Sequence, residues 1–349
     1  MMLDLPQFGK KPRGDRQKRI EQSPNYLEGS FQNLSPTKMM AEEASYWKMI
    51  GWYTWNKQVT APPKKIPSIK RNLKSPLEKG TKPIITWFGH SSYLLQISNI
   101  NILVDPVFCG FASPFESIGA KSYDGSNEYT IEDLPSIDLV VLSHDHYDHL
   151  DYHSILKLKD HTKKFICPLG VGAHLEHWGV PTSSIEELDW WQETRFIDSL
   201  VITCTPARHF SGRGLKRNQT LWASFVLSCD GYVLFLGGDS GYDNHFTEIG
   251  NKYGPFDLAI LECGQYNEYW KYIHMLPHQT LKAAIDLKTK VLLPVHWAKF
   301  TLAVHPWNES ITKLHYYKEV EQSQIVIASP MIGEAMVLDS ILPQSPWWK

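Results

Sequence analysis

The chain has 349 residues, a hydrophobic fraction of 42% and a formal net charge of −2 from 35 basic and 37 acidic residues. This length and apolar content allow a sizeable buried core within a single α/β domain. The balanced charge gives no broad basic surface, which argues against nucleic acid as a partner.

The first 82 residues differ from the rest. Residues 1–35 are polar and basic with scattered Pro and Gly, which predicts an extended arm. Residues 36–58 are expected to be partly helical, with Met39, Met40, Trp47 and Trp52 as apolar anchors, and residues 59–82 form a connector rich in Pro and Lys. We therefore predict an N-terminal arm and connector over 1–82, packed on a body formed by 83–349.

The body begins with short β-rich segments and then mixes strands and helices. Apolar or alternating runs predict strands at 84–88, 92–97, 101–104, 138–142, 165–167, 200–205, 221–228, 232–236, 258–261, 291–295, 325–328 and 334–338. Helices are expected at 152–159, 170–178, 242–252, 277–288 and 309–321. Strands and helices in these numbers favour a layered α/β architecture.

The most informative segment is the run HDHYDH at residues 144–149, directly after the predicted buried strand 138–142. Imidazole and carboxylate groups are ligands that suit Zn²⁺, Fe and Mn²⁺. His144 and His146 can converge on one metal, while Asp148 and His149 can face a second. Two such metals, roughly 3.5–4 Å apart, can share a bridging hydroxide.

A pair of metals needs more ligands, each from the end of another strand. Three residues meet this requirement: His209 follows the strand 200–205, Asp239 follows 232–236 in the sequence GGDSG, and His296 follows 291–295. A carboxylate such as Asp239 can bridge two cations with its two oxygens. The sequence thus predicts seven metal ligands: His144, His146, Asp148, His149, His209, Asp239 and His296.

This set resembles the signature of the metallo-β-lactamase superfamily, HxHxDH followed by a lone His, a lone Asp and a last His. The resemblance implies a four-layer αββα sandwich with a dimetal site at one edge. It implies that His144, His146 and His209 hold the first metal, that Asp148, His149 and His296 hold the second, and that Asp239 bridges. The superfamily's β-lactamases commonly have a cysteine in the second site, so Asp239 and its context favour the other hydrolase branches.

A narrower likeness connects the chain with the branch containing N-acylphosphatidylethanolamine-hydrolysing phospholipase D. It rests on ITWFGHSS at 85–92, LVDPVF at 103–108, GDSGY at 238–242, KYGPFDL at 252–258, HWAKF at 296–300 and the early SPNY…FQN segment at 23–33. The resemblance implies a phosphodiesterase of phospholipase D type that uses a metal-bridging hydroxide. A lactonase or other small-molecule hydrolase, and a non-catalytic or redox metal-binding protein, are the alternatives.

Further residues are candidates for supporting roles. Asp105, at a strand end, is expected to accept a hydrogen bond from a ligand histidine or the attacking water. His274 matches a family position near the metals and is expected to donate to a phosphate oxygen; Asp148, Asp105 and His274 are the predicted catalytic residues. His90 resembles another family position, whose role the sequence leaves open. Arg208 and Arg213 flank His209 and are assigned either to an anionic head group or to a solvated surface.

Cofactor, partners and location complete the sequence-based expectations. The cofactor is two divalent ions, with Zn²⁺ first and Fe or Mn²⁺ as alternatives. The substrate is a lipid or small-molecule phosphodiester, and peripheral membrane contact and homodimerisation are left open. The five cysteines form no Cys-x-x-Cys pair, and no apolar signal segment or stretch of 18 apolar residues occurs, so reduced thiols and a cytoplasmic location are expected.

Overall fold

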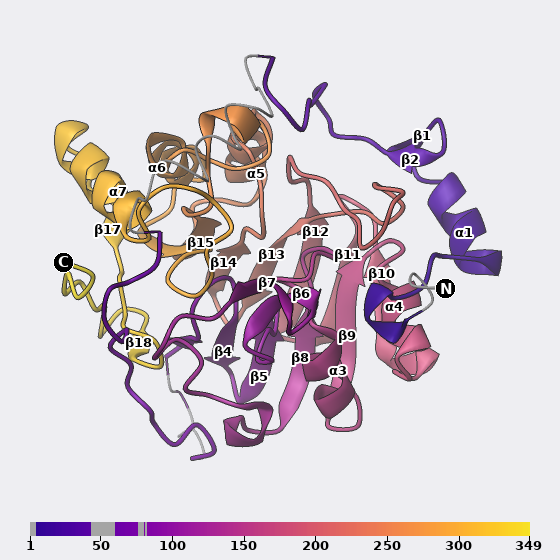
Figure 1. The fold of residues 1–349 in the computed structure, drawn as a ribbon, viewed down its shortest axis with the longest axis horizontal. Helices are drawn as coiled ribbons and strands as arrows, with labels where there is room; N and C mark the ends of the chain where they lie inside the picture. The colour runs from indigo at the N-terminus through magenta and orange to yellow at the C-terminus, as the bar shows by residue number, and fades with distance from the viewer. Residues whose placement is uncertain (1–4, 43–59, 76–79, 81) are drawn as a thin grey trace.

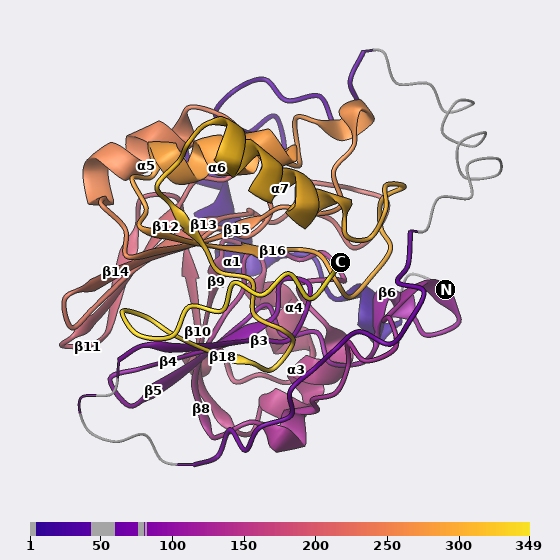
Figure 2. The same ribbon diagram turned by 90° about the vertical axis from the view of Figure 1, so that its left-hand side faces the viewer.

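The computed structural model describes residues 5–42, 60–75, 80 and 82–349. Within these residues two seven-stranded sheets pack against each other, and helices cover the outer face of each sheet (Figure 1, Figure 2). The four-layer α/β sandwich expected from the sequence is therefore confirmed.

The first sheet is built from the early part of the body. Its antiparallel half comes from β3 to β5, while β5, β8, β9 and β10 run parallel to their neighbours. The order across the sheet is β10 (Ile185–Leu188), β9 (Thr162–Pro168), β8 (Ile137–Val141), β5 (Ile100–Val104), β4 (Tyr93–Ile97), β3 (Ile84–Trp87) and β18 (Ala335–Val337).

The second sheet follows the same plan. Its first four strands are antiparallel, and β14 to β17 are parallel. The order is β11 (Glu193–Ile197), β12 (Leu200–Thr205), β13 (Ser224–Cys229), β14 (Tyr232–Leu236), β15 (Leu258–Glu262), β16 (Val291–Val295) and β17 (Val326–Ile327).

Burial on both faces explains the continuous apolar strands. The main core joins side chains of both sheets, including Val104, Leu139 and Phe235, and a second cluster packs α3 (Tyr152–Leu158) and α4 (Gly172–His177) on the first sheet. On the second sheet lie α5 (His245–Tyr253), α6 (Pro277–Asp286) and α7 (Glu309–Val320), as Figure 2 shows. Parallel strands covered in this way present their carboxyl ends as the accessible edge.

The N-terminal segment is more ordered than an extended arm. It contains a short 3₁₀ turn at Pro6–Phe8, the helix α1 (Gly14–Glu21) and a hairpin of β1 (Tyr26–Leu27) and β2 (Ser30–Phe31). Arg16 fixes α1 to the body through ion pairs of 2.6 Å with both Glu176 and Glu187. These long-range contacts stabilise the helix, which has no side-chain cap at its N-terminus.

Other elements were missed or lie outside the described part. Sequence patterns did not predict the hairpin β6 (Phe111–Phe115) and β7 (Ile118–Lys121), nor β10 and β11. The helix expected within 36–58 has no counterpart at 36–42, while Trp47 and Trp52 lie outside the described residues. Among the residues described, no helix has both the length and the apolar character needed to cross a bilayer.

Candidate metal centre

The predicted ligand residues gather where strands of the two sheets end. The run 144–149 follows β8 of the first sheet, while His209, Asp239 and His296 follow β12, β14 and β16 of the second. The structure brings all seven predicted ligand positions together, in groups whose donor atoms lie within 4.8 Å of one another. The site therefore straddles the seam between the sheets.

The first group consists of His144, His146 and His209. Nε2 of His144 lies 2.8 Å from Nδ1 of His146, which lies 3.3 Å from Nε2 of His209. Tetrahedral Zn²⁺ with ligand nitrogens at 2.0–2.1 Å requires nitrogen–nitrogen separations of about 3.3 Å. The three rings are thus spaced as the ligands of one cation are.

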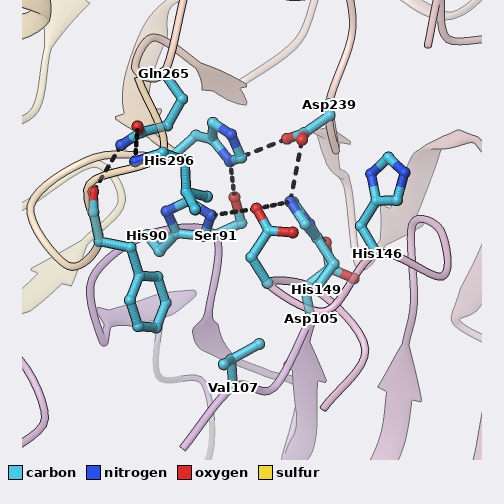
Figure 3. Close-up of polar contacts among 12 residues, drawn as sticks. His90, Ser91, Asp105, Val107, His146, His149, Asp239, Gln265 and His296 are labelled. Atoms are coloured by element: carbon cyan, nitrogen blue, oxygen red, sulfur yellow. Dashed lines mark hydrogen bonds and ion pairs between the residues drawn. The ribbon is translucent and has the colours of Figure 1, made fainter. Parts of the chain in front are cut away.

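The second group consists of Asp148, His149 and His296, with His90 as a fourth member. Oδ2 of Asp148 lies 3.6 Å from Nε2 of His149 and accepts a hydrogen bond of 2.9 Å from Nε2 of His90. The rings of His90 and His296 lie 4.1 Å apart between centroids. Figure 3 shows His90, His149 and His296 turned toward one another.

Asp239 lies between the two groups. Its Oδ2 is 3.1 Å from Nε2 of His149 and 3.8 Å from Nε2 of His209, while its Oδ1 is 3.1 Å from Nδ1 of His296. The carboxylate thus presents oxygen to histidines of both groups, the arrangement that a bridging ligand requires.

Two observations show that this donor set fits divalent cations. Among the described residues, Nε2 of His149 and Oδ1 of Asp239 are buried and, despite polar neighbours at 3.1 Å, take part in no well-directed hydrogen bond. Such orphaned polar atoms are uncommon unless a ligand or ion satisfies them. The set also consists only of imidazole and carboxylate, the groups suited to Zn²⁺, Fe and Mn²⁺. The residues can therefore hold metal.

Burial and the surrounding charges put several of these groups in the form that binds metal. His149 is an exception, since burial would lower its pKa but the carboxylates of Asp239 and Asp148 outweigh burial and raise that pKa. Burial and the neighbouring imidazoles lower the pKa of His144, and burial lowers that of His209, so both rings are neutral. Burial opposes ionisation of Asp239, but His149 and His296 outweigh it and hold the pKa of that carboxyl well below its usual value. Neutral imidazole and ionised carboxylate are the forms that bind metal.

Asp105 orients two of the histidines, directly and through Ser143. Its Oδ2 accepts a 2.8 Å hydrogen bond from Nδ1 of His149 and a 2.6 Å bond from Oγ of Ser143, and Oδ1 accepts from the Ser143 amide. Oγ of Ser143 in turn accepts from Nδ1 of His144 at 2.9 Å. With their Nδ1 atoms engaged, His149 and His144 present Nε2 to the centre. Figure 3 shows His149 between Asp105 and Asp239.

His274 occupies the rim of the centre and pairs with Glu262, which the sequence analysis did not single out. Nδ1 of His274 donates to Oε2 of Glu262 at 2.7 Å, and the other oxygen accepts from the amides of Ser240 and Met275. Burial alone would lower the pKa of His274, but the Glu262 carboxylate outweighs it and raises that pKa to about 9. The signal in the sequence that could have pointed to Glu262 is its position as an acidic residue at the end of β15, which is otherwise apolar.

Tight turns aim several of these side chains. His90, Asp105 and His296 are non-glycine residues with positive φ angles of 51°, 41° and 68°. Such backbone is uncommon for non-glycine residues, although Asp and His adopt it more readily than most, and it clusters at functional sites, where the surrounding structure maintains it. At Gly238, also at positive φ, an added Cβ would lie 2.7 Å from Cβ of Ser143.

The two arginines flanking His209 do not have the expected roles. Arg213 is buried, 5% exposed, and donates to the carbonyls of Asp145, Leu150 and Gln7, so it is neither solvated nor directed at a ligand. Arg208 is half-buried and donates to Thr37 Oγ1 and to backbone carbonyls. Both arginines stabilise loops by donating hydrogen bonds to backbone carbonyls. These carbonyls belong to segments distant in the sequence, so the contacts could not be predicted.

A pocket of about 380 Å³ opens onto the centre. Its floor contains residues of both metal groups, and its remaining wall is mostly apolar: Met39, Met40, Phe210, Trp270, Ile273 and Leu302. Gln265 shapes this wall, since its Nε2 donates to the Phe300 carbonyl and its Oε1 accepts from the amides of Leu302 and Ala303 (Figure 3).

The family follows from this architecture and from a sequence match. Residues 100–297 match the family model described as Beta-lactamase superfamily domain, which covers more than half of the chain. The chain belongs to the metallo-β-lactamase superfamily. As a superfamily member with this donor set, it is a metal-dependent hydrolase.

Relatives within the superfamily support the narrower likeness. An uncharacterized protein of Mycobacterium tuberculosis is 39% identical over 338 residues, 94% of this chain and 88% of that protein. N-acyl-phosphatidylethanolamine-hydrolyzing phospholipase D 1 of Caenorhabditis elegans is 31% identical over 62% of this chain and 64% of its own length. The mitochondrial enzyme of that name from Saccharomyces cerevisiae is 34% identical over 67% of this chain and 51% of its own length. The predicted resemblance to this branch is confirmed.

Solved structures agree on the fold. Igni18, a metallo hydrolase from Ignicoccus hospitalis, superposes with a TM-score of 0.56 at 22% identity, over 73% of this chain and 98% of that structure. An isothiocyanate hydrolase from Delia radicum gut bacteria gives a TM-score of 0.57 at 18% identity, with the same coverage of 73% and 98%.

Proposed function

We propose that the chain is a dinuclear metal-dependent phosphodiesterase of phospholipase D type that acts on N-acylphosphatidylethanolamine-like lipids. The observation that carries this proposal is the position of Asp239, which presents its carboxylate to histidines of both donor groups. Phosphatases and nucleases use metal pairs to stabilise the attacking and leaving oxygens, and a carboxylate shared by two ligand sets would hold such a pair together.

The lining of the pocket supports a lipid rather than a fully polar substrate. Apolar side chains such as Phe210, Trp270 and Ile273 border a floor of ligating groups. A phosphodiester with an acyl chain would place its charge on the floor and its hydrocarbon along this wall, where burial of apolar surface contributes roughly 25 cal/mol per Å². The likeness to the two phospholipases supports the same substrate class.

The chain's own residues would divide the work as follows. Bound cations would supply Lewis-acid stabilisation of developing charge and would acidify water. His274, held by Glu262, would donate from Nε2 to a non-bridging phosphate oxygen and fix its position. Asp148, held by His90, would orient the attacking water, and Asp105 would keep His149 in the ligating tautomer.

Metal-loaded protein with N-acylphosphatidylethanolamine in mixed micelles provides the test. We expect release of phosphatidic acid and an N-acylethanolamine, resolved by mass spectrometry, and loss of both products on chelation. His146→Ala should abolish turnover, whereas His153→Ala, at an exposed histidine outside the centre, should not.

The same preparation distinguishes the alternatives. Hydrolysis of lactones without cleavage of any phosphodiester would assign the chain to the lactonase alternative. Fully loaded protein that hydrolyses neither class would contradict the proposed function and would favour a binding or redox role.

A further inference from the structure

In the N-terminal arm, the side chain of Asn33 binds the backbone of His209, one of the predicted metal ligands. Asn33 ends the SPNY…FQN segment singled out in the sequence. Its Nδ2 donates to the carbonyl of His209 at 2.8 Å, and its Oδ1 accepts from the amide of His209 at 3.0 Å. One amide group thus binds both backbone polar groups of a residue 176 positions away.

This pair of hydrogen bonds replaces the pairing that a neighbouring strand would give. His209 lies beyond the end of β12, where the sheet ladder no longer reaches it. Buried backbone groups require partners, and among the described residues Asn33 is the partner recorded for both of these. The indole of Trp222 also donates to Oδ1 of Asn33, at 3.1 Å, which fixes the orientation of the amide.

The ring of His209 is restrained from the other side. Its Nδ1 donates to the carbonyl of Ile273 at 2.8 Å, so its Nε2 faces His146 and Asp239. A ring held at one end by Ile273 and at its backbone by Asn33 has little freedom to rotate or shift. Both contacts therefore determine where Nε2 lies.

The arm itself is anchored on each side of Asn33. Asn25 donates to Asp189 at 3.0 Å, the Phe31 amide donates to the carbonyl of Asn218 at 2.9 Å, and the Ala41 amide donates to the carbonyl of Tyr269 at 2.7 Å. Two residues before that last anchor, Met39 lines the substrate pocket. Hydrogen bonds therefore hold the arm to the body at positions both before and after Asn33 in the sequence.

We propose that Asn33 is a positioning residue for His209, and that the N-terminal arm is therefore a structural part of the metal centre. The inference rests on the proposed function to the extent that His209 ligates a metal. Asn33 touches neither metal nor substrate in this scheme; it acts by holding the backbone of a ligand. Residues that orient ligands commonly change metal affinity by 10- to 100-fold when replaced.

The test compares Asn33→Ala and Asn33→Asp with Asn25→Ala. Asn25 belongs to the same arm and makes the same kind of long-range hydrogen bond, but contacts Asp189 and not the centre. The probe is cobalt(II), whose visible absorption reports ligand geometry, titrated into the apoprotein. We expect Asn33→Ala to lose about tenfold in cobalt affinity and to shift the spectrum, while Asn25→Ala keeps both properties.

Asn33→Asp provides a second variant in case alanine prevents folding. Aspartate still accepts from the His209 amide but places oxygen against the His209 carbonyl, so we expect the same spectral shift. Unchanged affinity and spectrum in the Asn33 variants, or an equal loss in Asn25→Ala, would overturn the proposal. Wild-type protein that binds cobalt yet cleaves no phosphodiester would refute the proposed function alone, and wild-type protein that binds no cobalt would refute both.

Discussion

Nδ1 of His149 lies 2.8 Å from Oδ2 of Asp105, a carboxylate that is 1% exposed and also binds Ser143. Both carboxylate oxygens of Asp105 accept hydrogen bonds. An amide side chain at this position would therefore place its NH₂ group against one of the donors. Asp105 therefore couples the end of β5 to the run that follows β8.

Replacement of Asp105 by Asn should weaken metal binding without changing the ligand set. We expect a 10- to 100-fold loss of zinc affinity, measured by competition with a chromophoric chelator. Asp160→Asn, at an exposed carboxylate, is the control. Equal affinities in both variants would show that Asp105 has no orienting role.

Removal of one metal-ligating side chain should lower the number of metal ions bound per chain. His146→Ala leaves two imidazoles in the first group, so elemental analysis should find at most one metal per chain, against two in the wild type. His153→Ala should keep both. Two equivalents in His146→Ala would refute the ligand assignment.

Chelation should lower thermal stability, because metals that bind only the folded chain add a free energy of RT ln(1 + [L]/Kd). At a free zinc concentration of about a thousand times Kd this is about 4 kcal/mol, which corresponds to a Tm change on the order of 10 °C. Differential scanning calorimetry with EDTA, then with excess zinc, measures the loss and its recovery. A wild-type Tm that EDTA leaves unchanged would contradict binding at this centre.

Lys299 should make stability depend on pH. It is buried, donates to the carbonyls of Phe88 and Val107, and burial lowers its pKa to about 8. Between pH 8 and about 10.4 the unfolded chain binds more protons at this position than the folded one, so the Lys299 contribution to stability rises with pH in this window.

Lys299→Met removes that dependence. The free energy of unfolding of the wild type, relative to Lys299→Met, should rise by roughly 2–3 kcal/mol from pH 7 to pH 10. Urea unfolding at several pH values measures it, and Lys163→Met serves as an exposed control. A difference that is constant with pH would show that Lys299 does not change its pKa on folding.

Gly238→Ala should be more destabilising than Gly231→Ala. Both glycines have positive φ, 60° and 84°, but a Cβ at Gly238 would meet Ser143 and the Ala223 carbonyl within 2.9 Å, whereas at Gly231 nothing lies within 4 Å. We expect about 1–2 kcal/mol for the backbone strain in each variant, with a further loss for Gly238→Ala. Equal losses would show that the turn after β14 relaxes around the added methyl group.

The sequence predicted those parts of the molecule whose signal is local. The strands β14 and β16 are continuous apolar runs, β8 is interrupted only by Asp138, and β12 is largely apolar. Each predicted ligand follows one of these strands, so strand and site could be located together. Position at the ends of strands was enough to bring His209 and Asp239 near the run 144–149.

What the sequence could not predict depends on distant partners. The helix α1 has no side-chain cap and is held by Arg16 against Glu176 and Glu187. Glu262 is inconspicuous until its contact with His274 is known. The burial of Arg213 was not predictable, because the carbonyls that it binds belong to two segments far from it in the sequence, the loop after β8 and the N-terminal arm.

The contact of Asn33 with His209 also has a consequence for biosynthesis. Asn33 leaves the ribosome 176 residues before its partner, a delay of roughly 10–35 s at 5–20 residues per second. Asn33 must remain without this partner through that interval, although Glu176 and Glu187, which hold α1, emerge earlier. The last predicted ligand, His296, follows later still. The full set of ligands is therefore assembled only late in synthesis, and a nascent chain could not bind metal through all of them earlier.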